Sequence, residues 1–392
     1  MSVNKINYLV VFLYYSFLFE HFRFSLPVPY VLPLFILIIF LNIRYLLRFR
    51  VEKTSFIFLI FFFYSLLSLF YSLDKVEAMQ RNISLGLMIA FLMIIYKQLE
   101  KQYIVVFLKH ATILGVIYIL LNFIMYDSLL DYKGQLEGLT GNRHNSSILF
   151  GLYFIIIFVY SNFVSLRTKV ILYLVLLVDI YLIFMTFGRI GLYFIGLFFI
   201  FYGVYRFKET RHISKIFIIV VIIVAAVYLT PVLLDNVFIQ YMIERGLTGR
   251  DIISSSLIDV YLKNTYVTFT GFGAGSLEDI GRVIFEYLGI HGAVRDTNNF
   301  VAILIEYGLI GVFIFCYIFL KYFYCLFYLF RAKCFDCYFI GIIPVGLVLN
   351  ISESNWINFN SFSTILMFVF VLFVFKQYRQ LLKYHSIKKI RH

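Results

Sequence analysis

Three arginines placed against the ends of long apolar segments are the first candidates for chemistry in this sequence. Arg143 lies in the stretch GLTGNRHNSS, Arg189 in TFGRIG and Arg250 in GLTGRD. A guanidinium is planar, permanently charged and able to bind phosphate oxygens through paired hydrogen bonds. The three residues, with Arg245 as a weaker fourth, therefore predict a site for phosphate or diphosphate.

These arginines also have ordinary interpretations. Arg189 lies in a link too short to carry it into water, so its side chain could extend to the surface or pair with a buried carboxylate. The glycines at 138 and 141 allow a tight turn before a helix whose free amides attract an anion. Such turns also precede many helices that bind nothing.

A long polar interval, residues 233–297, separates two apolar segments and contains thirteen charged residues. Residues 250–261 have the apolar spacing of an amphipathic helix on a membrane surface, and GFGAG at 271–275 predicts a tight turn. The interval ends in DTNNFVAILIEYGLIG (296–311), where polar residues lead directly into an apolar helix. We expect it to fold as a partly helical cap over a working site, and an inert loop is the alternative.

The elements that must position these residues are membrane spans. The chain is 62% hydrophobic and its mean hydropathy is +0.92, which excludes a soluble globular domain. Because a span needs about 20 apolar residues, the sequence predicts an all-α integral membrane protein with about 12 transmembrane helices in one domain, 1–392, in which 233–297 is a large extracytoplasmic loop. The expected spans lie near residues 6–20, 27–43, 55–73, 83–97, 104–126, 145–163, 170–186, 190–205, 216–232, 298–320, 337–352 and 361–376.

A net charge of +13 is compatible with nucleic-acid binding or with a membrane protein, and the positions of the Lys and Arg residues along the chain distinguish the two. With the amino terminus inside, roughly twice as many Lys and Arg residues fall on inside connections as on outside ones, as short cytoplasmic loops require. The basic carboxy-terminal stretch KYHSIKKIRH then lies beside anionic lipid headgroups. This pattern predicts both termini in the cytoplasm and no nucleic-acid partner.

Motifs for other chemistries are missing from the sequence. It has no phosphate loop, dinucleotide fingerprint, HExxH or serine-hydrolase elbow. Cys334 and Cys337 form a CxxC, which is half of a typical zinc site without a second pair nearby. We therefore expect no metal and no cofactor.

The four motifs together resemble the superfamily of O-antigen polymerases and O-antigen ligases, which make bacterial surface polysaccharides. They are GLTGNRHNSSILFG at 138–151, TFGRIGLYF at 186–194, GRDIISSSLIDVY with GFGAG within 249–275, and DTNNFVAILIEYGLIG at 296–311. Their order, the number of spans and the single large loop also fit, so the resemblance covers most of the chain.

The resemblance implies a GT-C-like membrane glycosyltransferase in the bacterial cytoplasmic (inner) membrane, working on its outer face. Donor and acceptor would be polyprenyl-pyrophosphate-linked oligosaccharide repeat units, polymerised into O-antigen, capsule or exopolysaccharide, with a flippase and a chain-length regulator as further partners. Arg143, Arg189, Arg250 and Arg245 would bind the pyrophosphate. The candidate general bases are Asp296, Glu278, Asp279 and His291, and the candidate acceptor-sugar ligands are His144, Asn145, Asp251, Asn298 and Asn299.

Three positions depart from the pattern of this superfamily. Gly188 stands where members often have serine, Ile253 where they often have tryptophan, and Thr297 where ligases usually have histidine. Polymerases vary more at the last position, so polymerase is favoured over ligase.

A transporter for the same lipid-linked sugars is the alternative from another class. A carrier should bury ionisable residues near mid-membrane, yet the candidates are few: Lys109, Asp179 and Glu306.

Overall fold

The fold is known from a computed structural model, which describes residues 7–21, 31–46, 53–96, 99–131, 134–209, 250–288, 299–332, 341–348 and 362–390. Within these residues every regular element is a helix. The α-helices are α1 (Tyr8–His21), α2 (Val31–Leu41), α3 (Ile43–Leu46), α4 (Lys53–Leu67), α5 (Lys75–Tyr96), α6 (Lys101–Ile124), α7 (Arg143–Tyr160), α8 (Leu166–Met185), α9 (Arg189–Glu209), α12 (Arg250–Lys263), α13 (Ser276–Leu288), α14 (Asn299–Arg331), α15 (Ile342–Val348) and α16 (Phe362–Ile390). Short 3-10 turns join several of them: η2 (Ser68–Phe70), η3 (Tyr126–Leu129), η4 (Ser161–Phe163) and η5 (Thr265–Val267).

Six helices of the described chain are long and apolar enough to cross a membrane. They cover Lys75–Tyr96, Lys101–Ile124, Arg143–Phe163, Leu166–Met185, Phe300–Arg331 and Phe362–Tyr384. The expected count of twelve is not confirmed. At four other expected spans the helices are shorter apolar ones, the span expected at 337–352 is described only over 341–348, and the span expected at 216–232 lies outside the described residues.

The surface of these helices is apolar as well as their interior. On α4 and η2 the exposed large side chains recur every three or four residues, so they form one continuous face; they are Phe56, Ile60, Phe63, Leu67 and Phe70. A stripe of this size would be unfavourable in water and is suited to contact with lipid chains.

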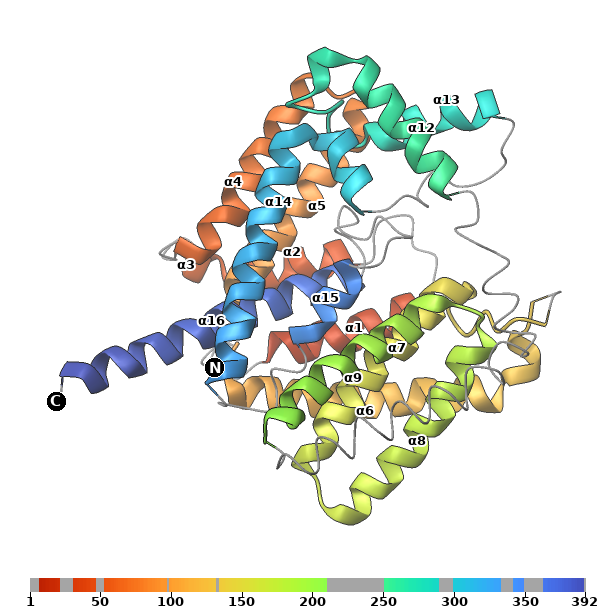
Figure 1. The fold of residues 1–392 in the computed structure, drawn as a ribbon, viewed down its shortest axis with the longest axis vertical. Coiled ribbons are helices and arrows are strands. Elements are labelled where there is room, and N and C mark those ends of the chain that lie inside the picture. The colour runs from red at the N-terminus through yellow and green to blue at the C-terminus, as the bar shows by residue number, and fades with distance from the viewer. Residues whose placement is uncertain are drawn as a thin grey trace.

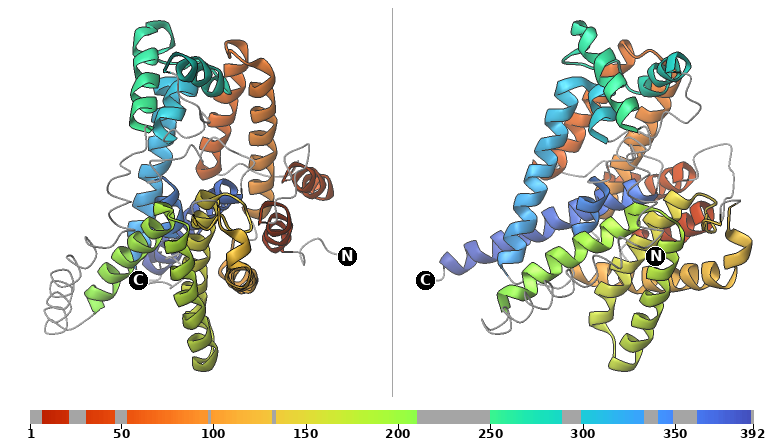
Figure 2. Two further views of the ribbon diagram at one scale, coloured as in Figure 1. Left: turned by 90° about the vertical axis from the view of Figure 1, so that its right-hand side faces the viewer. Right: turned by 45° about the vertical axis from the view of Figure 1, so that its right-hand side comes forward.

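The helices form two groups that α16 connects (Figure 1). The upper group contains α4, α5, α12, α13 and α14, and the lower group contains α6, α7, α8 and α9. Two further views show the same division (Figure 2).

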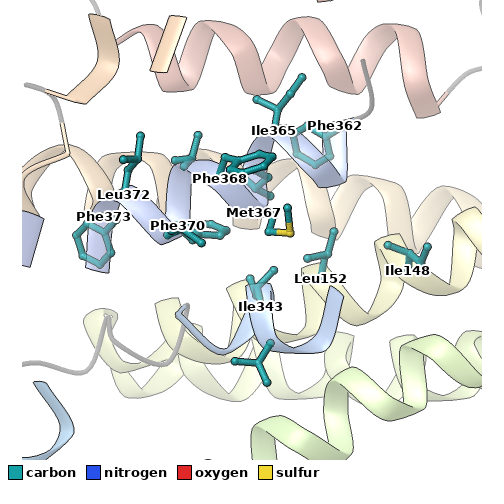
Figure 3. Close-up of a cluster of buried hydrophobic side chains, with 14 of the residues drawn as sticks. Ile148, Leu152, Ile343, Phe362, Ile365, Met367, Phe368, Phe370, Leu372 and Phe373 are labelled. Atoms are coloured by element: carbon teal, nitrogen blue, oxygen red, sulfur yellow. The ribbon is translucent and has the colours of Figure 1, made fainter. Parts of the chain in front are cut away.

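The core is centred on the first half of α16. Residues 362–375 are buried on every side, the pattern of a helix enclosed by others. Its side chains pack against Leu152 of α7 and Ile343 of α15 (Figure 3). Phe12 of α1 links this core to the other helices, with ring centroids 5.6 Å from Phe362 and 5.5 Å from Phe91 of α5. Because lipid is as apolar as these side chains, the close fit of the rings holds the helices together.

Helix α14 is broken at Gly308 and folds back on itself. The backbone there has φ 60° and ψ −163°, a conformation open almost only to glycine. The rings of Phe300 and Phe315 lie 5.5 Å apart, whereas fifteen residues of straight helix would separate them by about 22 Å. Residues 299–307 are therefore a short half-helix that runs back alongside the longer half, 309–331.

This hairpin corrects the straight span expected at 298–320. A continuous helix over all of α14 would be about 50 Å long, well beyond a hydrocarbon core of about 30 Å. The second half alone, at about 35 Å, matches that thickness. The polar residues before α14 consequently precede a re-entrant half-helix.

We predict that Gly308→Ala destabilises the protein by at least about 1–3 kcal/mol, the cost of a residue held in this part of backbone space. The new Cβ would also lie 2.5 Å from Gly271 N and from Phe269 O. The thermal midpoint of the detergent-solubilised protein measures the effect. Gly196→Ala on α9 is the control, since its Cβ would meet nothing within 4 Å. Equal midpoints for the two variants would contradict the hairpin.

Candidate functional site

The first turn of α7 carries Arg143 and is built by its own loop. Asn142 is the N-cap residue, and its side chain accepts hydrogen bonds from His144 N at 2.9 Å and Asn145 N at 3.4 Å. Caps of this kind stabilise a helix by about 1 kcal/mol. The GLTGN stretch thus begins a helix, as the sequence predicted.

The side chain of Arg143 is held beside the preceding loop. Its guanidinium donates to the side-chain oxygen of Gln135, which is buried. The same loop is tied to the end of α8 by Leu136 N, which donates to Met185 O at 2.8 Å. Arg143 is only partly exposed, and it begins a helix whose dipole favours a nearby anion.

The link TFGRIG is fastened to the same turn of α7 through one hydroxyl. Ser147 Oγ donates to Gly188 O at 3.0 Å and accepts from Gly191 N at 3.0 Å. Helices α7 and α9 therefore begin next to each other, and two of the three predicted arginine motifs converge. The sequence could not predict this convergence, because Ser147 and Gly191, the end of the link, are 44 positions apart and about half of the residues between them form α8.

The close approach of the two helices explains why position 188 is glycine. A Cβ at Gly188 would lie 2.5 Å from Ser147 Cβ, and one at Gly151 would lie 3.0 Å from Gly191 Cα. Phe187, two residues before the arginine, has a positive φ of 52°, which is uncommon for a bulky residue. The link is therefore a strained turn held by its neighbours.

Two of the three predicted phosphate-binding arginines are the first residues of helices, since Arg143 begins α7 and Arg189 begins α9. Arg250 is the first described residue of α12, because residues 210–249 lie outside the described part of the chain. A helix amino terminus presents free amides and the positive end of the dipole, so a guanidinium there adds to a favourable anion site. The first turn of α12 is the end of that helix that points toward the lower group (Figures 1 and 2).

Several predicted residues lie outside the part that can be described. Those outside the described residues are Arg245, His291, Asp296, Thr297 and Asn298. For another group only the backbone is described, as part of a helix: Arg189, Arg250, Asp251, Ile253 and Asn299. The convergence of the three guanidinium groups on one diphosphate thus stays a prediction.

The described part of the long interval, 250–288, is the helical cap that its spacing predicted. It contains α12, η5 and α13, and it packs against the ends of α4, α5 and α14. Tyr261 of α12 donates to Thr268 O, and burial raises the pKa of its hydroxyl, which therefore remains a donor at neutral pH.

The loop 268–273 of this cap supplies the partners that the break in α14 needs. Phe272 N donates to Ile305 O at 2.8 Å and Gly273 N to Glu306 O at 2.9 Å. In return, Thr268 O accepts from Leu309 N at 3.1 Å and Phe269 O from Ile310 N at 3.2 Å. On the other side, Tyr64 of α4 donates to Tyr307 O at 2.8 Å. Backbone groups at a break in a membrane helix must be satisfied inside the protein, and here they are.

A second ionic cluster, which sequence reasoning missed, surrounds Arg81 of α5. Its guanidinium lies 2.5 Å from the carboxylate of Glu306, 2.8 Å from Glu77 and 3.7 Å from Glu278. Glu306 is fully buried, and Arg81 is its ion-pair partner among the described residues. One base candidate, Glu278, is thus part of an ion-pair network.

Two signals in the sequence could have indicated this cluster. Glu77 and Arg81 are four residues apart on one helix, a spacing typical of an ion pair. Glu306 interrupts an otherwise apolar run, where an acidic residue needs a partner. Which residue pairs with Glu306 could not be read from the sequence, because Arg81 is 225 positions away.

The buried ionisable residues expected of a carrier remain few. Asp179 of α8 is fully buried, and neither of its oxygens has a hydrogen-bond partner among the described residues. Lys109 is exposed, and Glu306 belongs to the Arg81 cluster. Within the described chain no group of three His, Cys, Asp or Glu residues could hold a metal ion.

Comparison of the chain with protein-family models, curated proteins and solved structures found no significant match.

We predict that Ser147→Ala loosens the link before α9 and lowers stability by about 1 kcal/mol, a typical value for one interhelical hydrogen bond in a membrane. The thermal midpoint in detergent should fall. Ser128→Ala is the matched control, because the Ser128 hydroxyl also bonds to a backbone carbonyl but is exposed. If the midpoint of Ser147→Ala is no lower than that of the control, Ser147 does not hold the two arginine motifs together.

Proposed function

We propose that the protein polymerises polyprenyl-pyrophosphate-linked oligosaccharide repeat units on the outer face of the cytoplasmic membrane. The observation that carries the proposal is the placement of Arg143 and Arg189 at the first residues of α7 and α9, two helices joined through Ser147. Arg250 lies in the first described turn of α12. Guanidinium groups at helix amino termini suit a diphosphate leaving group, and the apolar surface suits its lipid tail.

The reaction joins two such units by one displacement. A hydroxyl oxygen of the acceptor sugar attacks C1 of the donor sugar, and the bond between C1 and the phosphate oxygen breaks. The electron pair leaves with the lipid pyrophosphate, whose charge the arginines stabilise, and the hydroxyl proton passes to a general base. Asp296, His291 and Glu278 are the candidate bases, with the Asn299 end of α14 in the acceptor region.

Contacts between connections support the predicted alternation of the spans. Ser72 and Ala274, which the charge pattern assigns to the outside, are hydrogen bonded at 2.7 Å. Two connections assigned to the inside also meet, since Lys376 Nζ donates to Tyr96 O at 2.9 Å. Contacts of this kind support the alternation of the spans, and the charge pattern alone assigns the termini to the cytoplasm and the cap to the outside.

A lipid-linked oligosaccharide flippase is the second candidate, favoured by the break in α14. Discontinuous helices are characteristic of secondary transporters, in which they form the substrate site. A ligase-type transferase would use the same arginines with a different acceptor.

Deletion of the gene separates these functions. Loss of a polymerase should leave single repeat units on the lipid carrier and on the surface, as seen on a gel of extracted polysaccharide. Loss of a flippase should remove surface polysaccharide altogether and would overturn the proposal. Loss of a ligase should leave full-length chains on the carrier and would also overturn it.

We predict that Arg189→Ala abolishes chain lengthening while the protein stays in the membrane. Arg189→Lys should restore less than about a tenth of the activity, because an ammonium cannot make the paired contacts of a guanidinium. Chain length on a gel and membrane abundance by immunoblot are the measurements.

Arg167→Ala is the matched control, since Arg167 is exposed at the start of α8, at the opposite end of that helix from the Arg189 link. Normal chain lengths in Arg189→Ala would remove this residue from the site.

A further inference from the structure

We infer that Arg81 is a positioning residue: it acts through Glu306 to hold the re-entrant half-helix 299–307, and so sets where the Asn299 end lies for the acceptor chain. The inference rests on the proposed polymerase function for the role of that end. The mechanical part, that Arg81 holds the half-helix, stands on the geometry alone.

The ion pair reaches the half-helix where it turns. Glu306 lies two residues before the break at Gly308, and its carboxylate is 2.5 Å from Arg81 Nη1. The Arg81 guanidinium also contacts Glu77 on its own helix and Glu278 on α13. One side chain thereby joins α5, the cap and the half-helix.

Among the described residues, the polar contacts that hold the half-helix lie near the break, away from Asn299. Its covalent connection to the rest of α14 passes through glycine, and its polar backbone contacts gather at residues 305–307, beside the break. Toward Asn299 the contacts become apolar, such as the rings of Phe300 and Phe315. A small rotation at the apex would therefore displace the Asn299 end, which is about 13 Å away along the helix axis.

Stability by itself does not explain the pair. Replacing a buried ion pair by apolar residues of similar size is often neutral or stabilising, whereas removing one partner leaves a buried charge and is costly. What the ion pair adds is a fixed orientation of the half-helix, because a guanidinium and a carboxylate bind each other in a defined geometry.

The depth of the Asn299 end follows from the same hairpin. The half-helix runs back along 309–331, so the Asn299 end lies beside the longer half at about the level of Phe315. An acceptor sugar bound there would be shielded from bulk water, which would otherwise compete with its hydroxyl for the donor.

Crosslinking tests the mechanical part without any substrate. In a protein whose four cysteines are replaced by alanine, Phe300→Cys with Phe315→Cys should form a disulfide on oxidation with copper phenanthroline, and Phe300→Cys with Tyr324→Cys should not. Adding Arg81→Gln should slow the first crosslink at least about tenfold, whereas Arg282→Gln, an exposed arginine on α13, should leave it unchanged. An unchanged rate in Arg81→Gln would overturn the inference.

Kinetics with purified lipid-linked repeat units test the functional part. Arg81→Lys and Glu306→Gln should raise the acceptor KM at least about tenfold and leave the donor KM within about threefold of wild type. The double variant Arg81→Met with Glu306→Leu should regain normal membrane abundance and thermal midpoint, yet keep the raised acceptor KM.

A double variant with wild-type kinetics would show that the pair only stabilises the fold and would overturn the inference. Failure of the polymerase proposal looks different, because the wild-type protein would then not lengthen chains at all, and the crosslinking result would still stand.

Discussion

The constraint on which this structure depends is that backbone polar groups in a membrane need partners within the protein. The break at Gly308 frees carbonyls at the end of one half of α14 and amides at the start of the other. Each of five such groups receives a partner from loop 268–273 or from Tyr64. The cap, α4 and α14 are thereby one unit, since loss of the loop would leave those groups unsatisfied at a cost of several kcal/mol each.

Glycine makes this contact possible because only a residue without Cβ lets the two backbones approach. At Gly271, with a φ of 72°, a Cβ would lie 2.5 Å from the carbonyl carbon of Glu306. The GFGAG stretch is therefore a backbone contact surface for the broken helix, in addition to the tight turn that the sequence predicted. Its partners are the carbonyls of α14, which would repel an anion.

The charged residues of the described chain fall into two kinds with different chemistry. Around Arg81 a guanidinium is surrounded by three carboxylates, so the cluster carries excess negative charge and has no affinity for a phosphate group. Arg143 is bound to a neutral amide and begins a helix, so its positive charge remains available. This difference in charge is why the proposed diphosphate site is assigned to the amino termini of α7 and α9, whereas the Arg81 cluster joins the cap to α5 and α14.

The sequence by itself determined the class of the protein, its helical character and where its polar residues concentrate. Apolar length and the limited reach of a helix are local properties, so the helices α5, α6, α7 and α8 could be predicted near their observed places. The N-cap at Asn142 and the helical cap over 250–288 follow from equally local patterns. Only the tertiary structure decided that α14 folds back at Gly308, that Ser147 joins the two arginine motifs, and that Arg81 pairs with Glu306. These depend on contacts between residues far apart in the chain, and a helical hairpin has the same apolar composition as a straight span. What decides these features is that the backbone groups freed at Gly308 and the buried charge of Glu306 bind residues far away in the chain. No local sequence pattern shows which residues those are.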